Sequence, residues 1–127
     1  MYFFIDTHVL VWYLEGNKKL PLRLRKIIDD ETNQIIISVA SLWELAIKIA
    51  SGKLDSDLTF PQIQSHILQS QYVISGISYA HLNTLMTLPN HHGDTFDRML
   101  IAQAISENLA VISIDKQFKN YDVTIVW

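Results

Sequence analysis

Two hydrophobic patterns alternate along this chain, and each is typical of one kind of secondary structure. Short runs of adjacent apolar residues, such as the three isoleucines at residues 35–37, are typical of strands buried on both faces of a parallel sheet. Longer segments in which apolar residues recur every three or four positions are typical of helices. The runs predict strands at residues 2–5, 34–39, 72–77, 110–114 and 123–126. The longer segments predict helices at residues 8–15, 21–30, 41–51, 61–71, 79–88 and 96–107.

The order of these elements predicts the fold class. Strands alternate with helices and the connections are short, so the sheet is expected to be mainly parallel, with helices on both faces. We therefore expect a three-layer α/β/α fold with a central sheet of about five strands. At 127 residues the chain fits one such domain, residues 1–127, and it contains no internal repeat or linker.

Composition excludes several classes of protein. Hydrophobic residues make up 49% of the chain and charged residues 18%, which supplies a core and is unlike a disordered chain. There is no cysteine, so disulfides, thiolate metal sites and cysteine nucleophiles are excluded. The apolar start lacks a basic leader and carries Asp6 and His8, which favours folded structure over a signal peptide. No apolar run approaches the roughly 18 residues of a membrane helix, so we expect a soluble, cytoplasmic protein with no membrane partner.

Charge is distributed unevenly. The net charge of −3 argues against strong non-specific binding to nucleic acid, which depends on Lys and Arg. A basic run fits a solvated helix face and a phosphate-contacting patch equally well, and it consists of Lys18, Lys19, Arg23, Arg25 and Lys26.

The aromatic residues Trp12, Tyr13 and Trp43 are expected in the core rather than at an interface.

Four carboxylates are predicted to meet at one edge of the sheet. Asp6 and Asp115 each follow an apolar strand, and ligands of open parallel sheets bind outside the carboxyl ends of the strands. Glu44 and Asp97 are expected in the first turns of the helices that begin at this edge. Crowded carboxylates repel one another, so such a cluster favours a divalent cation. Oxygen ligands suit Mg²⁺ first and Mn²⁺ second, and such ions support phosphodiester hydrolysis.

Each acid also has a structural alternative. Asp6 and Asp115 could cap the helices that follow their strands. Ser41 and Glu44 are spaced as a capping box, and Asp97 could complement the dipole of its helix. The joint placement of all four acids at one edge favours the metal site over these separate explanations.

Four segments of the chain resemble those of the PIN-domain ribonucleases, specifically the VapC-like toxins of prokaryotic type II toxin-antitoxin pairs. The resemblance covers essentially the whole chain, and the segments have the order and spacing of that family. They are FIDTHVLVW at residues 4–12, ISVASLWELAIK at 37–48 with GKL at 52–54, DTFDRMLIAQA at 94–104, and ISID at 112–115 with Phe118.

The resemblance implies a function and its residues. It implies an endoribonuclease whose acids hold one or two Mg²⁺ ions and which forms no covalent intermediate. It also implies an RNA substrate, a homodimer, and a cognate antitoxin whose C-terminal segment enters the acidic site. The family usually has proline where this chain has Thr95, which affects loop stiffness more than chemistry. The metal-binding acids implied are Asp6, Glu44, Asp97 and Asp115, with Asp94 as a further candidate and Thr7 or Ser113 as hydrogen-bond donors to a carboxylate.

The sequence gives less specific evidence for the roles of the basic residues and histidines near these acids. Arg98 either contacts phosphate or pairs with a neighbouring acid, and we favour the ion pair. Lys48 lies four residues after Glu44 and is expected to pair with it. The histidines His8, His91 and His92 match no zinc motif, so they are expected at the surface.

Three other functions share parts of this pattern. A phosphatase of the haloacid-dehalogenase kind also begins with a strand that ends in Asp, but it needs a second Asp two residues later, where this chain has His8. A structure-specific DNA nuclease uses the same carboxylate chemistry, but this short chain lacks room for elements that thread its substrate. An inactive PIN-like module that binds RNA or protein is disfavoured because all four acids are present.

Overall fold

The computed structural model describes residues 1–127 as alternating strands and helices, much as the hydrophobic pattern predicts. The strands are β1 (Tyr2–Ile5), β2 (Gln34–Ser38), β3 (Val73–Ser75), β4 (Ala110–Ile112) and β5 (Ile125–Val126). The α-helices are α1 (Thr7–Glu15), α2 (Leu22–Asp29), α3 (Val39–Ala50), α4 (Phe60–Gln69), α5 (Tyr79–Thr87) and α6 (Thr95–Glu107), and a short 3₁₀ helix, η1, spans Lys116–Asn120.

All four strand pairings are parallel, and the strands lie in the order β3-β2-β1-β4-β5. The chain therefore adds β2 and β3 on one side of β1 and then crosses to add β4 and β5 on the other. In the register, Phe4 lies opposite both Ile36 and Val111. The point where the strand order reverses lies between β1 and β4, and in open α/β sheets this is where ligands bind.

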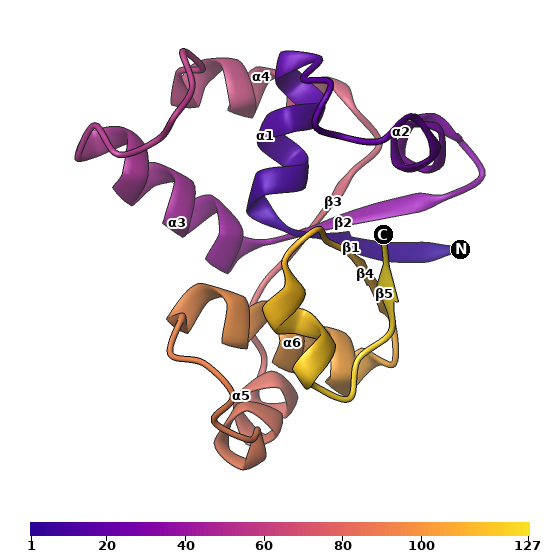
Figure 1. Ribbon diagram of the computed structural model, residues 1–127, viewed down its shortest axis with the longest axis vertical. Coiled ribbons are helices and arrows are strands. Elements are labelled where there is room, and N and C mark those ends of the chain that lie inside the picture. Colours follow the sequence, from indigo (N-terminus) through magenta and orange to yellow (C-terminus); the bar gives the residue numbers. More distant parts are fainter.

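Helices cover both faces of the sheet and bury two separate apolar layers (Figure 1). Alternate residues of a strand point to opposite faces, so Phe3 and Ile5 pack under α1 to α4, whereas Phe4 packs against α6 and η1. Phe4 is completely buried. Truncating a buried phenylalanine to alanine typically costs about 3–5 kcal/mol of unfolding free energy. The predicted three-layer fold is confirmed.

The start of α3 differs from the sequence prediction. The helix begins at Val39, directly after β2, because the hydroxyl of Ser38 accepts the backbone N–H of Ala40 at 3.1 Å and caps it. Ser41 is therefore a buried residue inside the helix, and the capping box predicted for Ser41 and Glu44 is wrong. Glu44 lies in the second turn of α3 rather than the first.

The prediction that Trp43 lies in the core is also wrong. Its side chain is 59% exposed, and its ring meets that of Phe96 edge-on, with centroids 5.2 Å apart. Trp12 and Tyr13 of α1, also predicted in the core, are only partly buried and pack against its edge. Strand β4 ends at Ile112 rather than Ile114, because its pairing with the two-residue strand β5 ends there. No helix is both long and apolar enough to cross a membrane.

Candidate active site

Asp6 lies directly after β1, at the point where the strand order reverses. Its side chain is buried, and its two oxygens have different partners. Oδ1 accepts the backbone N–H of Val9 at 3.1 Å and so caps α1, whereas Oδ2 accepts the hydroxyl of Ser113 at 2.5 Å. The capping role considered from the sequence is therefore present, and it leaves Asp6 fixed at the carboxyl end of the sheet.

Ser113 connects Asp6 to a second acid. The Ser113 hydroxyl donates to Asp6 and accepts the backbone N–H of Asp115 at 3.0 Å. One oxygen of Asp115 caps η1 by accepting the N–H of Gln117 at 2.9 Å. No hydrogen bond occupies the other oxygen of Asp115 within the protein, so that oxygen is available to a ligand.

Asp94 and Asp97 come from the start of α6. Oδ1 of Asp94 accepts the backbone N–H of Asp97 at 2.9 Å and caps the helix. Asp97 lies in the first helical turn, as the sequence predicts. Thr95 occupies the first position of the helix, where the family usually has proline, and the Asp94 cap forms without it.

Glu44 reaches the same region from α3, and both of its oxygens have partners. The Thr7 hydroxyl donates to Oε1 at 2.6 Å, and the Lys48 ammonium lies 3.1 Å from Oε2. The expected pair between Lys48 and Glu44 is therefore present. Glu44 is buried, so these two contacts hold its carboxylate in one position.

His92 contacts Asp97, a contact that the sequence analysis missed. Its Nε2 lies 3.3 Å from Oδ2 of Asp97, and its Nδ1 lies 2.7 Å from the hydroxyl of Tyr121. That hydroxyl already accepts the backbone N–H of His92 and a guanidinium N–H of Arg98, so its own hydrogen is directed at Nδ1. The neutral tautomer that fits this network donates from Nε2 to Asp97.

The ion pair favoured for Arg98 is wrong. Its guanidinium donates to the carbonyl oxygens of Leu88 and Pro89 at 3.2 and 2.7 Å and to the hydroxyl of Tyr121 at 3.1 Å. The side chain thus points back to the loop that precedes α6 rather than toward an acid. Arg98 therefore holds that loop and Tyr121 in place.

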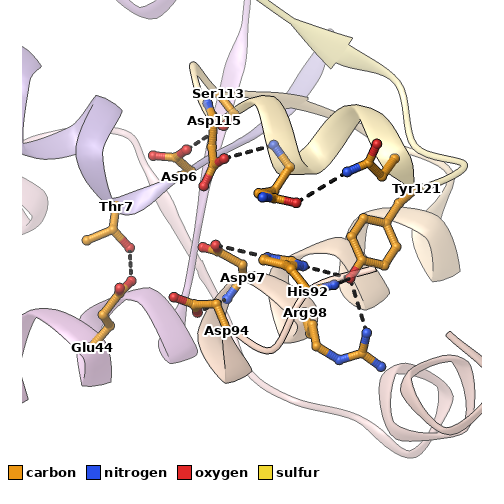
Figure 2. A network of polar contacts seen from close by, with 12 residues as sticks. Asp6, Thr7, Glu44, His92, Asp94, Asp97, Arg98, Ser113, Asp115 and Tyr121 are labelled. Atoms are coloured by element: carbon orange, nitrogen blue, oxygen red, sulfur yellow. Dashed lines mark hydrogen bonds and ion pairs between the residues drawn. The ribbon is translucent and has the colours of Figure 1, made fainter. Parts of the chain in front are cut away.

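Five carboxyl groups influence one another in this region (Figure 2). The pKa of Asp97 rises to about 8, first because burial disfavours its charged form and then because of repulsion from other carboxylates. Burial also raises the pKa of Asp6, although the hydrogen bond from Ser113 and the N–H of Val9 oppose the shift. The carboxylates that repel Asp97 are, in decreasing order, those of Asp94, Asp6, Asp115 and Glu44.

The donor set fits a hard divalent cation. Every donor is a carboxylate oxygen, and a bound cation would relieve the repulsion that raises the pKa of Asp97. No group of three or more acids or histidines is close enough, as the side chains lie, to hold one ion together. Three of these acids would therefore have to move closer together to hold one ion directly.

Comparisons with known proteins agree with this fold. Residues 3–123 match the sequence model of the family described as PIN domain. A solved structure of VapBC2 from Rickettsia felis, bound to a DNA fragment from its promoter, is similar with a TM-score of 0.74 and 20% identity, over 99% of this chain and 98% of that one. FitAcB from Neisseria gonorrhoeae is similar with a TM-score of 0.69 and 18% identity, over 100% of this chain and 97% of that one. No curated protein sequence matches the chain.

Proposed function

Because this chain belongs to the PIN domain family, whose members are generally nucleases, we propose that it is a Mg²⁺-dependent endoribonuclease and the toxin of a toxin-antitoxin pair. One observation carries the proposal. Asp97 has a pKa of about 8 because it is buried beside four other carboxylates, at the edge of a parallel sheet where ligands bind. A charge cluster this unfavourable is expected where a cation belongs, and phosphodiester hydrolysis is the chemistry that such cations support.

The proposed metal ligands are Asp6, Asp97 and Asp115, with Glu44 and Asp94 beside them. When bound, Mg²⁺, or Mn²⁺ in its place, supplies Lewis-acid stabilisation of a phosphodiester and a more acidic water. The chain's own residues fix the carboxylates: Ser113 orients Asp6, and His92 orients Asp97. Below pH 8 and without a cation, Asp97 holds a proton, which it must release when the cation binds.

Glu44 has a separate task in this proposal. Its two oxygens are already engaged by the hydroxyl of Thr7 and the ammonium of Lys48. Each oxygen keeps a second lone pair, with which it can accept a hydrogen bond from a water at the site, and the carboxylate adds negative charge that attracts the cation.

The proposed partners follow from the family resemblance and from the named structures, which include VapBC2 and FitAcB. We propose a cognate antitoxin that places an Arg or Lys among the acids, because a cation there can replace the charge of the metal. RNA is the proposed substrate, and the cytoplasm is where the protein would meet it.

A homodimer is also part of the proposal, and exposed apolar residues support it. Tyr79 and Met86 on α5 are 87% and 83% exposed, and the neighbouring edge strand β3 also exposes apolar side chains. On α5, Tyr79, Leu82 and Met86 recur at helical spacing and share one face, and exposed apolar faces mark interaction sites. A second copy of the chain is the proposed occupant of this apolar face, which consists of Val73, Ile74, Ile77, Tyr79, Leu82 and Met86.

The experiment incubates the purified chain, free of any partner, with total cellular RNA in Mg²⁺, Mn²⁺ or EDTA, and the new RNA ends are mapped. Asp6→Asn is the test variant. Asp57→Asn is its matched control, because Asp57 is an exposed aspartate in the loop between α3 and α4. We expect cleavage with either metal by the wild type and by Asp57→Asn, and none with EDTA or with Asp6→Asn.

Other outcomes would favour the alternatives. A folded wild type that neither cleaves RNA nor binds Mn²⁺ would favour an inactive PIN-like module that binds RNA or protein. Metal-dependent cleavage of structured DNA in place of RNA would favour a small DNA nuclease. Release of phosphate from small phosphomonoesters would favour the phosphatase, although His8 stands where that chemistry needs an aspartate.

A further inference from the structure

A basic pocket lies beside Glu44, because two of its lining residues, Thr7 and Lys48, contact that carboxylate. It has a volume of about 250 Å³ and lies between the first turns of α1 and the carboxyl end of α3. Three lysines line it against a single carboxylate, that of Asp55, in a chain whose net charge is −3. The lysines are Lys19, Lys48 and Lys53.

Nearby contacts position two of these lysines at the pocket: a backbone turn after α3 positions Lys53, and the ring of Trp12 positions Lys19. Gly52 ends α3 in the left-handed conformation, with φ of 68°, and the chain turns so that the backbone N–H of Lys53 donates to the carbonyl of Lys48 at 2.8 Å. Lys19 follows α1, and its ammonium lies 5.8 Å from the ring centroid of Trp12. A cation over an indole is favourable, and this contact places the exposed Lys19 side chain at the rim of the pocket.

The pocket is connected to the acids through two contacts. Thr7 lines the pocket, directly follows Asp6, and donates its hydroxyl to Glu44. Lys48 lines the pocket as well, and its ammonium pairs with the other oxygen of Glu44. Lys48 is therefore neutralised, whereas Lys19 and Lys53 have no carboxylate within ion-pair distance. These two lysines leave a positive site one side chain away from the proposed metal ligands.

We propose that this pocket binds a phosphate of the RNA strand that neighbours the phosphate being cleaved, with Lys19 and Lys53 as its ligands. This inference rests on the proposed function. A strand lying across the acids brings further phosphates to either side, and the acids themselves repel each of them. The lysines supply the attraction on one side, fix the direction of the strand, and account for RNA binding by an acidic protein.

The test compares Lys19→Gln/Lys53→Gln with the matched control Lys18→Gln/Lys26→Gln. Both pairs remove two positive charges from exposed side chains, and neither Lys18 nor Lys26 lines the pocket. Binding of a labelled single-stranded RNA is measured by anisotropy in Mg²⁺ over a range of salt concentrations. Both pairs are made in the Asp97→Asn background so that the RNA is bound without being cleaved. Thermal unfolding, and Mn²⁺ titration of the same pairs with Asp97 intact, verify that the fold and the metal site are unchanged.

We expect the pocket pair to weaken RNA binding about tenfold and to reduce the slope of log affinity against log salt by about 0.7, the contribution of one single-strand phosphate. The control pair should leave the slope unchanged. Equal slopes for the two pairs would overturn the inference. So would a pocket pair that binds RNA normally but loses binding to poly-glutamate, because the pocket would then be a site for an acidic protein.

The failure of this inference is distinguishable from failure of the proposed function. Wild type that cleaves RNA, together with pocket and control pairs that behave alike, refutes the pocket alone. Wild type that neither binds nor cleaves RNA refutes the proposed function and the pocket with it.

Discussion

The imidazole of His92 lies between Asp97 and Tyr121, with Nε2 3.3 Å from the carboxylate and Nδ1 2.7 Å from the phenol. This arrangement fixes which nitrogen faces the acid. Removing the imidazole would leave Asp97 without a partner other than the carboxylates that repel it. The orientation of Asp97 therefore depends on the loop that precedes α6.

We expect His92→Ala to lower the affinity for Mn²⁺ by roughly 10- to 100-fold, the usual cost of losing a residue that orients a metal ligand. His92→Gln should recover part of the loss, because its amide can also donate to Asp97. His91→Ala is the control, since His91 contacts the ring of Tyr121 but no acid. Calorimetric titration measures the affinities, and an unchanged value for His92→Ala would contradict the positioning role.

Asp97→Asn should lower activity while raising the stability of the metal-free protein. We expect RNA cleavage and growth arrest to fall by more than about 100-fold, because a proposed metal ligand is lost. In EDTA at pH 9 the variant should nevertheless melt at a higher temperature than the wild type, because asparagine removes a buried, repelled charge. Growth arrest as strong as that of the wild type would remove Asp97 from the mechanism.

The stability of the metal-free protein should depend on pH through Asp97. Its pKa is about 8 in the folded protein, above the value of about 3.9 for an unfolded aspartate, so the folded state binds the proton more tightly. The stabilisation of the folded state by this proton is complete below pH 4 and is lost as the pH rises through 8. Melting temperatures in EDTA should therefore fall between pH 6 and pH 9, and less so for Asp97→Asn. Added Mg²⁺ should restore the difference at pH 9, and identical pH profiles for the two proteins would refute this account.

Ser113→Ala should destabilise the fold by roughly 1–3 kcal/mol, because the buried carboxylate of Asp6 loses a donor and the N–H of Asp115 loses an acceptor. The free energy of unfolding from urea titration measures the change. Ser106→Ala, on α6 outside the acid cluster, is a control for the loss of a hydroxyl group. A change no larger than that of the control would mean that these two hydrogen bonds contribute little.

Met86→Glu should convert the proposed homodimer to a monomer, because it places a charge among the exposed apolar side chains of β3 and α5. Light scattering coupled to size exclusion gives the mass. Leu68→Glu on α4 is the matched control, since Leu68 is 74% exposed on a different helix. A wild type that is monomeric at every concentration would contradict the dimer directly.

The hydrophobic pattern predicts the strands and the positions of the acids because both depend on local sequence. The run at residues 2–5 predicts β1 to the residue, and the two carboxylates that follow β1 and β4 lie at the same end of the sheet because the strands are parallel. Hydrogen bonds from Thr7 and Ser113 to carboxylates, expected from the family resemblance, are both present.

The hydrophobic pattern does not predict features that depend on competition between neighbouring residues or on contacts between distant parts of the chain. Ser38 and Ser41 both fit a helix cap, and the sheet decides between them, because β2 runs directly into α3. Arg98 finds carbonyl oxygens in the preceding loop instead of an acid, and Tyr121 joins it from the far end of the chain. The only sequence signal for His92 is that it lies five residues before Asp97.

The bond between Asp6 and Ser113 joins side chains that are 107 residues apart. A ribosome synthesising this chain makes β1 first and β4 near the end, so the pairing that brings the two residues together forms late. Until then the growing chain carries Asp6, Glu44 and Asp97 but lacks the strand that closes their site. An incomplete chain therefore lacks the completed acid site, and under the proposed function it would not cut the ribosomal and messenger RNA that surrounds it during synthesis.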